Sequence, residues 1–105
     1  MKFKQSFGET VKKLREERNL TLREVAEQLQ IDISMLSKIE KNNRKASKQL
    51  IERIALFFNV KDKDLKITFL SDKVAYDVMG EEDFAHEVLK VAEKKVKYLI
   101  SQKNS

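Results

Sequence analysis

Apolar residues recur at helical spacing along the whole sequence. Near the start they fall at i, i+4 and i+7 with charged residues between them, which predicts an amphipathic helix over residues 6–18. Thr21 and Glu24 then have the spacing of a capping box, which predicts a second helix that ends near Gln30. The apolar residues of these helices are Phe7, Val11 and Leu14 in the first and Leu22, Val25, Ala26 and Leu29 in the second.

Two further helices are predicted between residues 32 and 59. Asp32 is a suitable N-cap for the first, which has one apolar and one polar face. Ser47 is a suitable N-cap for the second, and Asn59 suits the left-handed position after its end. The apolar residues are Met35, Leu36 and Ile39 in the first helix, which leaves Ser34, Ser37, Lys38 and Lys41 outside, and Leu50, Ile51, Ile54, Ala55 and Phe58 in the second.

The last third of the chain holds two more predicted helices, with more apolar surface than a thin hairpin needs. The first runs from Lys63 to about Val78, Gly80 breaks it, and the acids that follow suit the positive N-terminus of the second. No strand alternation, repeat or low-complexity linker stands out, so the pattern predicts an all-α protein. The apolar residues are Leu65, Ile67, Phe69, Leu70, Val74, Tyr76 and Val78 in the first helix and Ala85, Val88, Ala92, Val96 and Leu99 in the second.

Composition places these helices in one small domain, or in a small domain with an appendage. Of the 105 residues, 41% are hydrophobic and 37% charged, a balance that suits thin helical layers with much exposed surface. The chain has no Cys and hence no disulfide or thiolate metal site, which fits a reducing cytoplasm. No segment has the character of a signal peptide or of a membrane span of about 20 apolar residues. We therefore expect a soluble cytoplasmic protein.

Positive charge is concentrated in one segment. The formal net charge is +5, which favours an anionic partner. Most of the excess lies in residues 38–48, where Glu40 is the single acid. A basic loop between two helices is usually only solvated, so the positive charge alone does not predict DNA binding. The pattern of the helices beside the loop has to be considered with it. The bases are Lys38, Lys41, Arg44, Lys45 and Lys48.

The second and third predicted helices have the pattern of a helix-turn-helix. Two short helices that cross closely need a small residue at the crossing, and Ala26 is that residue. Apolar residues sit at the spacing that seals such a pair, while the outer face of the later helix stays polar. These sealing residues are Val25, Leu29, Ile31, Leu36 and Ile39.

The run LREERNLTLREVAEQLQIDISMLSKIEKNNRKASKQLIERIALFFNV resembles the lambda-repressor-like (Xre/Cro-type) family of transcriptional regulators, over about residues 6–66. The resemblance implies a five-helix DNA-binding domain in residues 1–66 and a helical extension in residues 67–105. It also implies that the third helix enters the major groove of double-stranded DNA and that dimers read half-sites about 34 Å apart. Compact bacterial or phage repressors, and the controller proteins of restriction-modification systems, have a similar layout.

The resemblance assigns DNA contacts residue by residue, with two departures from the family pattern. Many relatives hold a phosphate with Gln where this chain has Leu22, so that contact is lost or passes to Arg23 or to backbone amides. The turn has Gln30 where Gly is usual, which costs about 1 kcal/mol if the residue is left-handed. The implied base contacts are Asp32, Ile33, Ser34, Ser37 and Lys38, with Lys38 the best candidate for guanine and a cap role alone as the alternative for Asp32. The implied backbone contacts are Thr21, Arg23, Lys41, Asn42, Asn43, Arg44 and Lys45.

The excess apolar surface of the last two helices suggests a homodimer interface. Two-fold pairing doubles the number of base contacts and fixes the spacing of the half-sites. The alternative is that the last helix folds back on its own domain. The residues proposed for the interface are Phe69, Leu70, Val74 and Tyr76 in one helix and Val88, Ala92, Val96 and Leu99 in the other.

The sequence offers no catalytic or metal-binding constellation. His86 has no partner at metal-ligand spacing, and Ser34 and Ser37 have no nearby base. We therefore expect no enzymatic activity, cofactor, metal or small-molecule ligand. The preferred hypothesis is a sequence-specific, dimeric transcriptional regulator. The rival is an antitoxin or protein-interaction module with the same fold, favoured by Leu22 and by three acids near the binding face, which are Glu24, Glu27 and Glu40.

Overall fold

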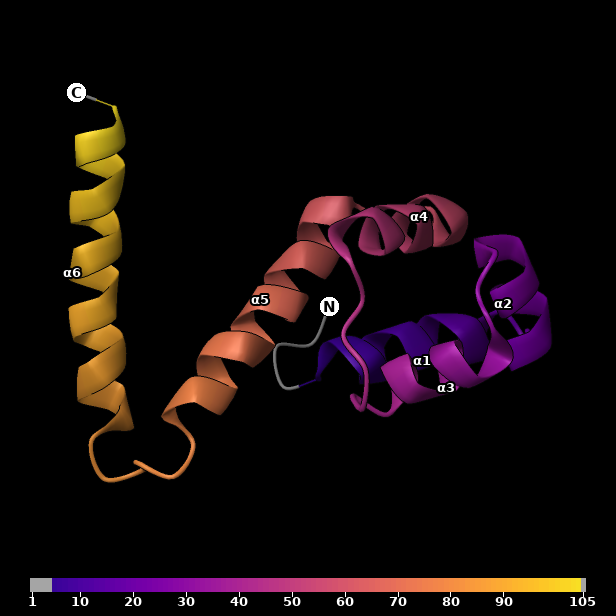
Figure 1. The fold of residues 1–105 in the computed structure, drawn as a ribbon, viewed down its shortest axis with the longest axis horizontal. Helices are drawn as coiled ribbons and strands as arrows, with labels where there is room; N and C mark the ends of the chain where they lie inside the picture. The colour runs from indigo at the N-terminus through magenta and orange to yellow at the C-terminus, as the bar shows by residue number, and fades with distance from the viewer. Residues whose placement is uncertain (1–4, 105) are drawn as a thin grey trace. The chain divides into compact units, whose positions relative to one another are not determined.

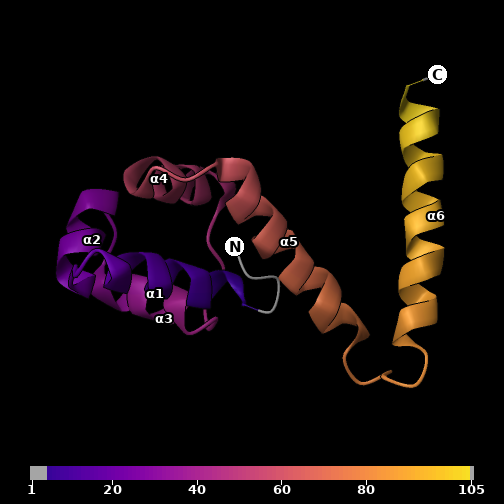
Figure 2. The same cartoon turned by 180° about the vertical axis from the view of Figure 1, so that it is seen from behind.

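The computed structural model describes residues 5–104, and every regular element in this range is a helix (Figures 1 and 2). This confirms the all-α prediction. None of these helices combines the length and apolar character that crossing a bilayer requires. The elements are α1 (Phe7–Glu17), α2 (Leu22–Leu29), α3 (Ile33–Glu40), α4 (Lys48–Phe58), α5 (Asp62–Val78) and α6 (Ala85–Lys103).

Side-chain caps fix where three of the helices begin. The Thr21 hydroxyl accepts a hydrogen bond from the Glu24 amide, and the Glu24 carboxylate accepts one from the Thr21 amide, as predicted. Ser6 and Glu9 form a second capping box at the start of α1. Ser47 caps α4 by accepting from the amide of Leu50. Each cap satisfies backbone donors that have no partner inside the helix.

Each of the first four helices is followed within two residues by a residue with a left-handed backbone. After α2, Gln30 has φ 58° and the amide of Ile31 donates to the carbonyl of Ala26, a bond that closes the end of the helix. Asn59 has φ 54° after α4, as predicted. Asparagine tolerates this conformation better than most residues, whereas glutamine has no such advantage. The four left-handed residues are Asn19, Gln30, Asn42 and Asn59.

Replacing Gln30 by glycine is expected to raise the free energy of unfolding by about 0.5 to 1 kcal/mol, because relief of the left-handed strain exceeds the added entropy of the unfolded chain. Urea unfolding followed by circular dichroism measures this change. Asn42→Gly is the matched contrast and should destabilise the protein, since the Asn42 side chain bonds to Gly8 and Ser6. Equal effects of the two substitutions would contradict the assignment.

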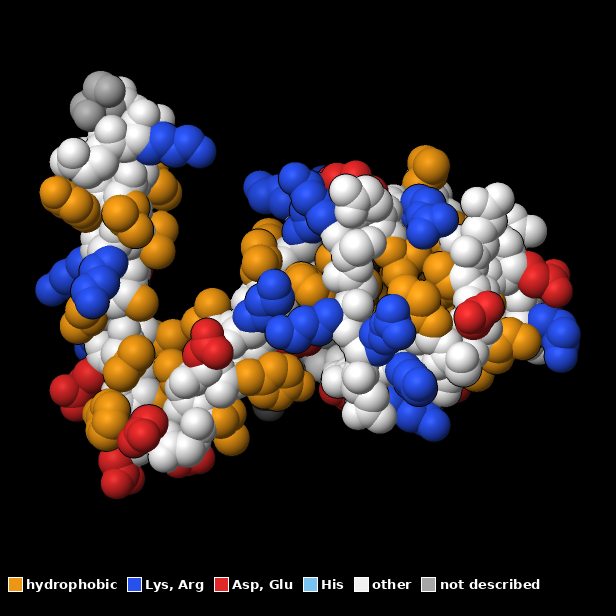
Figure 3. Space-filling view, viewed as in Figure 1, with side chains coloured by type: hydrophobic (Ala, Val, Ile, Leu, Met, Phe, Trp, Pro, Cys, Tyr) orange, Lys and Arg blue, Asp and Glu red, His pale blue; other side chains and the backbone are white. Residues whose placement is uncertain are grey.

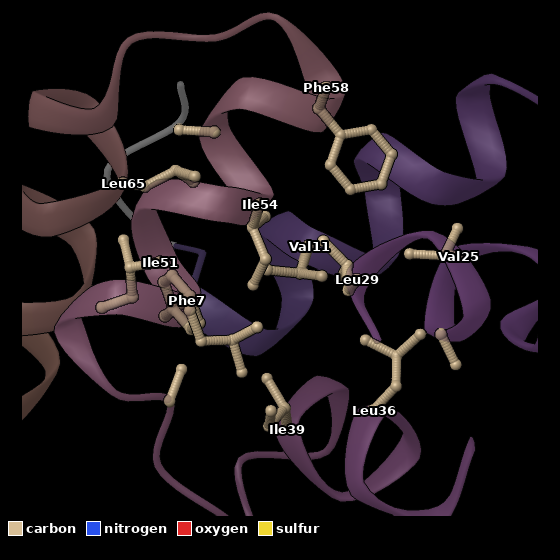
Figure 4. Packing of buried hydrophobic residues seen from close by; sticks show 14 residues of the cluster. Phe7, Val11, Val25, Leu29, Leu36, Ile39, Ile51, Ile54, Phe58 and Leu65 are labelled. Carbon is tan, nitrogen blue, oxygen red and sulfur yellow. The ribbon is translucent and has the colours of Figure 1, made fainter. Parts of the chain in front are cut away.

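One apolar core joins α1 to α4 with the start of α5 (Figure 4). Helix α1 packs on α3, and α2 packs on both α3 and α4. Ala26, the small residue predicted at the crossing of α2 and α3, is buried. The labelled side chains in Figure 4 point toward one another from all five helices: Phe7, Val11, Val25, Leu29, Leu36, Ile39, Ile51, Ile54, Phe58 and Leu65.

The chain divides into two compact units after Asp72. The first unit therefore continues beyond residue 66, the predicted end of the DNA-binding domain, and includes the first part of α5. Phe69 belongs to it, because its ring packs edge-on against Phe7 with the ring centroids 5.3 Å apart. The described part of the second unit, residues 73–104, contains no buried residue.

Candidate nucleic-acid interface

The predicted helix pair is present as two helices of eight residues joined by a short turn. Helix α2 ends at Leu29 and α3 begins at Ile33. Arg53 of α4 donates to the carbonyl of Leu29 at 2.8 Å, which ties the end of α2 to the rest of the domain. The inner residues of α3, Leu36 and Ile39, are fully buried, so α3 is held firmly with its other face outward.

The outer face of α3 carries the predicted groove-facing side chains. Ser34 and Lys38 are exposed, and Ser37 is half-buried beside them. Ile33 is 38% exposed at the start of this face, so its side chain can contact an apolar group such as a thymine methyl. The face thus combines hydrogen-bonding, cationic and apolar groups, all on one helix.

Asp32 occupies the N-cap position of α3, but its carboxylate makes no capping hydrogen bond. The backbone has the extended conformation that an N-cap residue adopts, with φ −69° and ψ 148°. Asp32 is thus the N-cap residue, as predicted, but the helix that it precedes does not use its exposed carboxylate. Its oxygens remain free to accept hydrogen bonds from outside the protein.

The segment after α3 presents cations on the same side as the helix (Figure 3). Lys41, Arg44 and Lys45 are exposed, and none of them forms an ion pair with another residue in the range 5–104. Lys38 of α3 is free in the same sense. A group of unpaired cations beside a polar helix face creates a local positive potential that attracts a polyanion.

Asn42 lies among these cations but is engaged inside the protein. Its side-chain oxygen accepts a hydrogen bond from the amide of Gly8 at 3.0 Å, and its side-chain nitrogen donates to the hydroxyl of Ser6 at 2.8 Å. Asn42 has φ 63° and its amide donates to the carbonyl of Ile39. The residue therefore shapes the segment, whereas Asn43 next to it exposes its side chain.

The start of α2 carries the other residues predicted to contact a phosphate, Thr21 and Arg23. The Thr21 hydroxyl accepts from the Glu24 amide, which leaves its own proton available to donate, and Arg23 is exposed. Hydrogen bonds from the backbone and then the side chain of Thr21 hold the pKa of Glu24 below its ordinary value. Glu24 therefore stays ionised and bound in the capping box. Leu22, the departure from the family pattern, packs against the core.

Glu40 is buried rather than exposed at the binding face. Arg15 of α1 binds it with two hydrogen bonds, from Nε at 2.8 Å and from Nη2 at 3.0 Å, and also donates to the carbonyl of Leu20. The exposed fractions of the two side chains are 12% and 4%. The bond to Glu40 raises the pKa of Arg15 above its already high value, so the arginine stays charged. The single acid in the basic segment is thus neutralised inside the domain.

Comparison with known proteins agrees with this geometry. A family profile described as a helix-turn-helix domain matches residues 8–67, more than half of the chain. The chain belongs to the helix-turn-helix domain family. This family consists of DNA-binding domains rather than enzymes. No curated protein sequence matches the chain significantly.

Two solved structures show the same fold as this helix-turn-helix protein. The first is the clp gene regulator ClgR from Corynebacterium glutamicum, with a TM-score of 0.55 and 20% identity over 90% of this chain and 95% of that one. The second is a chain of the SinR/SinI protein complex, with a TM-score of 0.54 and 24% identity over 94% of this chain and 99% of that one. At these identities the likeness concerns the fold alone.

Three residues that shape the interface were missed by the sequence analysis. Arg15 holds Glu40, and Gly8 allows α1 to approach the end of α3, where an added Cβ would lie 2.4 Å from the carbonyl oxygen of Ile39. Arg53 supports the end of α2. Weak signals were present, because Gly8 is one of two glycines in the chain and Glu40 is the one acid in a basic segment.

Proposed function

We propose that this protein is a dimeric, sequence-specific transcriptional regulator, of the repressor or controller type, that reads DNA with α3. One observation carries the proposal: the exposed polar face of α3 is continuous with unpaired cations in the segment that follows it. Bases are distinguished in the major groove by hydrogen-bonding and apolar side chains, and phosphates are held by cations. Both sets are present at adjacent positions of this domain.

Each groove-facing residue has a role that its chemistry suits. Lys38 donates to the acceptor edge of guanine, and Ser34 and Ser37 bond to base edges or to a phosphate. Ile33 contacts a thymine methyl group, and the free carboxylate of Asp32 accepts from the amino group of cytosine. The exposed residues that would hold the DNA backbone are Thr21, Arg23, Lys41, Asn43, Arg44 and Lys45.

Lys38→Ala and Arg44→Ala should have different effects on DNA binding. Lys38→Ala is expected to cost about 1 to 3 kcal/mol on the preferred operator and to relax the preference at one base position. Arg44→Ala should weaken binding to all sequences alike and reduce the salt slope by about one unit. Selection from a random duplex library, followed by titration at several salt concentrations, measures both quantities.

Loss of Lys38 that weakened every sequence equally would make it a phosphate contact and contradict its role in base recognition. The behaviour of the parent protein tests the whole proposal. The parent protein should enrich a motif with two-fold symmetry and should bind random duplex with salt-sensitive affinity. A protein that enriches no motif and shows no salt-dependent binding to random duplex would overturn the DNA-binding function.

The proposed dimer is supported by the exposed apolar residues of the C-terminal helices. Helix α6 has 19 residues, none of them buried, and apolar side chains occur along its length (Figure 3). Phe69 is left out of the proposed interface because it packs on its own domain. The alternative that α6 folds back on its own domain requires the same residues to be covered. The remaining interface residues are Leu70, Val74, Tyr76, Val88, Ala92, Val96 and Leu99.

Leu99→Asp is expected to convert the dimer to a monomer, because a charge at a covered apolar position has no partner there. Leu70→Asp should act in the same way. Sedimentation equilibrium measures the change, with circular dichroism to verify folding. His86→Asp makes the same charge change at an exposed position of α6 and should leave the association intact. A folded and dimeric Leu99→Asp variant would contradict the interface.

A protein-interaction module is the second candidate function, since one related fold was solved as a complex of two proteins, SinR and SinI. The three acids that favour this function in the sequence support it less in the structure. Glu40 is buried against Arg15 and Glu24 is bound in the capping box, so Glu27 is the one exposed, uncommitted acid of the three. Binding to random duplex at moderate salt separates the two functions.

A further inference from the structure

One apolar stripe runs along most of α6. Its members follow one another at intervals of three, four and three residues, so they lie on one side of the helix. The intervals are the same when they are read from either end, which makes the stripe symmetric about position 94. Its members are Leu89, Val96 and Leu99, which are exposed, and Ala92, which is half-buried.

The charged residues of this region are divided between its two ends. Residues 81–87, which include the turn before α6 and its first residues, contain four acids and no Lys or Arg. Residues 94–103, the second half of α6, contain four lysines and no acid. Figure 3 shows the acids gathered at the start of the helix and lysines toward its C-terminal end. Helix α6 therefore has an acidic end and a basic end, joined by the apolar stripe.

On a second copy of the chain the same stripe is available to cover this one, and the orientation of the two helices decides which charges meet. In a parallel pair, the acidic ends lie together and so do the basic ends. In an antiparallel pair, each acidic end lies beside a basic end. Like charges brought together at an interface are unfavourable, whereas opposite charges within a Debye length of about 8 Å attract each other. The charge distribution therefore favours the antiparallel pair.

Lys103 makes the difference specific, because it lies on the same side of α6 as the stripe, one turn after Leu99. In a parallel pair it would face the same lysine of the second copy. In an antiparallel pair centred on position 94 it reaches the start of the other helix, near Ala85 and the acids that precede it. The charges at both ends of α6 are thus complemented by a second copy alone, without a different protein.

The apolar residues also match in the antiparallel arrangement. Because the stripe is symmetric about position 94, Leu89 lies opposite Leu99 of the second copy, and Ala92 lies opposite Val96. Each layer between the helices then consists of two apolar side chains. The two central layers combine a small residue with a larger one, which lets the helices approach closely.

We propose that α6 pairs with α6 of a second copy in antiparallel orientation, with position 94 at the two-fold axis. This inference rests on the proposed function, in which the protein is a dimer, and it supplies the orientation and register that the proposed dimer leaves open. Each stripe covers the other, and the acidic end of each helix lies beside the basic end of its partner.

The test uses the full chain, which has no cysteine, so that every introduced thiol is unique. Leu89→Cys and Leu99→Cys are prepared separately and oxidised under mild conditions, each alone and as a mixture. In the antiparallel pair, identical cysteines of the two copies are about 15 Å apart along the helix, whereas a disulfide requires Cα atoms within about 7 Å. The two different cysteines lie opposite each other in the mixture.

The mixture is therefore expected to form disulfide-linked dimers at least about tenfold faster than either variant alone, as measured by non-reducing electrophoresis. Glu87→Cys mixed with Ser101→Cys is the matched control. These two exposed positions lie at the same two ends of α6, on the side away from the stripe. The control mixture should remain unlinked.

Charge reversal tests the orientation without cysteines. Lys95→Glu with Lys103→Glu in one chain should lower the association constant about tenfold at low salt and less at high salt, since each dimer contains both ends twice. Adding Glu81→Lys and Asp83→Lys to the same chain should restore association, because opposite charges meet again. In a parallel pair the first change would only replace base–base contacts by acid–acid contacts. Sedimentation equilibrium measures association, and circular dichroism verifies folding.

Failure of this inference is distinguishable from failure of the proposed dimer. Faster linking of each cysteine variant alone than of the mixture would retain the dimer and show that α6 pairs in parallel. A dimeric parent whose cysteine variants do not link would place the interface elsewhere and also contradict the inference. A monomeric parent with no linking in any sample would remove the dimer and the inference together. Charge reversal that leaves association unchanged would exclude the charges as the determinant of orientation.

Discussion

Replacing Glu40 by alanine is expected to lower the free energy of unfolding by about 3 to 5 kcal/mol, because it leaves the guanidinium of Arg15 buried without its partner. Arg15 is 12% exposed and donates two hydrogen bonds to Glu40, so water cannot replace the lost acceptor fully. For a domain of this size the loss is a large share of the total stability. Urea unfolding at neutral pH, monitored by circular dichroism, measures it.

Two variants make this expectation specific to the buried pair. Glu27→Ala removes an exposed acid from the same region and should change stability by no more than about 0.5 kcal/mol. Substituting both members of the pair, as Arg15→Met with Glu40→Leu, should recover part of the loss, since no unpaired charge remains. A loss below about 1 kcal/mol for Glu40→Ala would show that the pair contributes no more than an exposed one.

Gly8→Ala is the second substitution with a large expected effect, a destabilisation of about 3 kcal/mol. The added methyl group would lie 2.4 Å from the carbonyl oxygen of Ile39 and 2.6 Å from that of Glu40. Both obstacles are backbone atoms, so α1 has to move away from the end of α3. The same unfolding measurement applies, and weaker specific DNA binding should accompany it because α3 loses its support.

Lys12→Ala is the control for Gly8→Ala. It introduces the same residue at an exposed position of α1 and should leave stability within about 0.5 kcal/mol of the parent. A Gly8→Ala variant as stable as Lys12→Ala would show that α1 and α3 are not in the close contact described.

The helices themselves were predictable because their signals are local. The capping box of Thr21 and Glu24, the Ser47 cap and the left-handed Asn59 all occur where the sequence predicts them. The buried position of Ala26 follows from the spacing of the apolar residues around it. Gln30 is left-handed although its side chain does not favour that conformation, because the packed helices on either side determine it.

The contacts that support the interface were not predictable from periodicity. The spacing of apolar residues shows which face of a helix is buried, but it does not show which residue of another element it meets. Arg15 and Glu40 are 25 positions apart, and Phe7 and Asp72, whose carboxylate accepts from the Phe7 amide, are 65 apart. The sequence places Glu40 among the acids near the binding face, and the pattern gives no sign of its buried partner, because charged residues are rarely buried.

The division of α5 between the two compact units was not visible in the sequence for a related reason. Leu65 and Phe69 belong to one apolar face with Leu70 and Val74 in the sequence, which gives no sign that the face is divided. In the structure Leu65 is buried and Phe69 packs on Phe7, whereas Leu70 and Val74 are 56% and 48% exposed. The unit therefore extends through Asp72, and the proposed interface begins in the middle of α5.

The absence of any buried residue in α6 has a consequence for how the protein melts. A helix of 19 residues of which none is buried gains little stability from tertiary packing, so its helical state depends on what covers it. With a second copy as that cover, melting of α6 shifts with protein concentration, whereas melting of the domain does not. In a cell with few copies of the protein, proteases would then cleave α6 first and leave a folded but monomeric domain. The cellular concentration of the protein would therefore determine whether a dimeric regulator or a single DNA-binding domain is present.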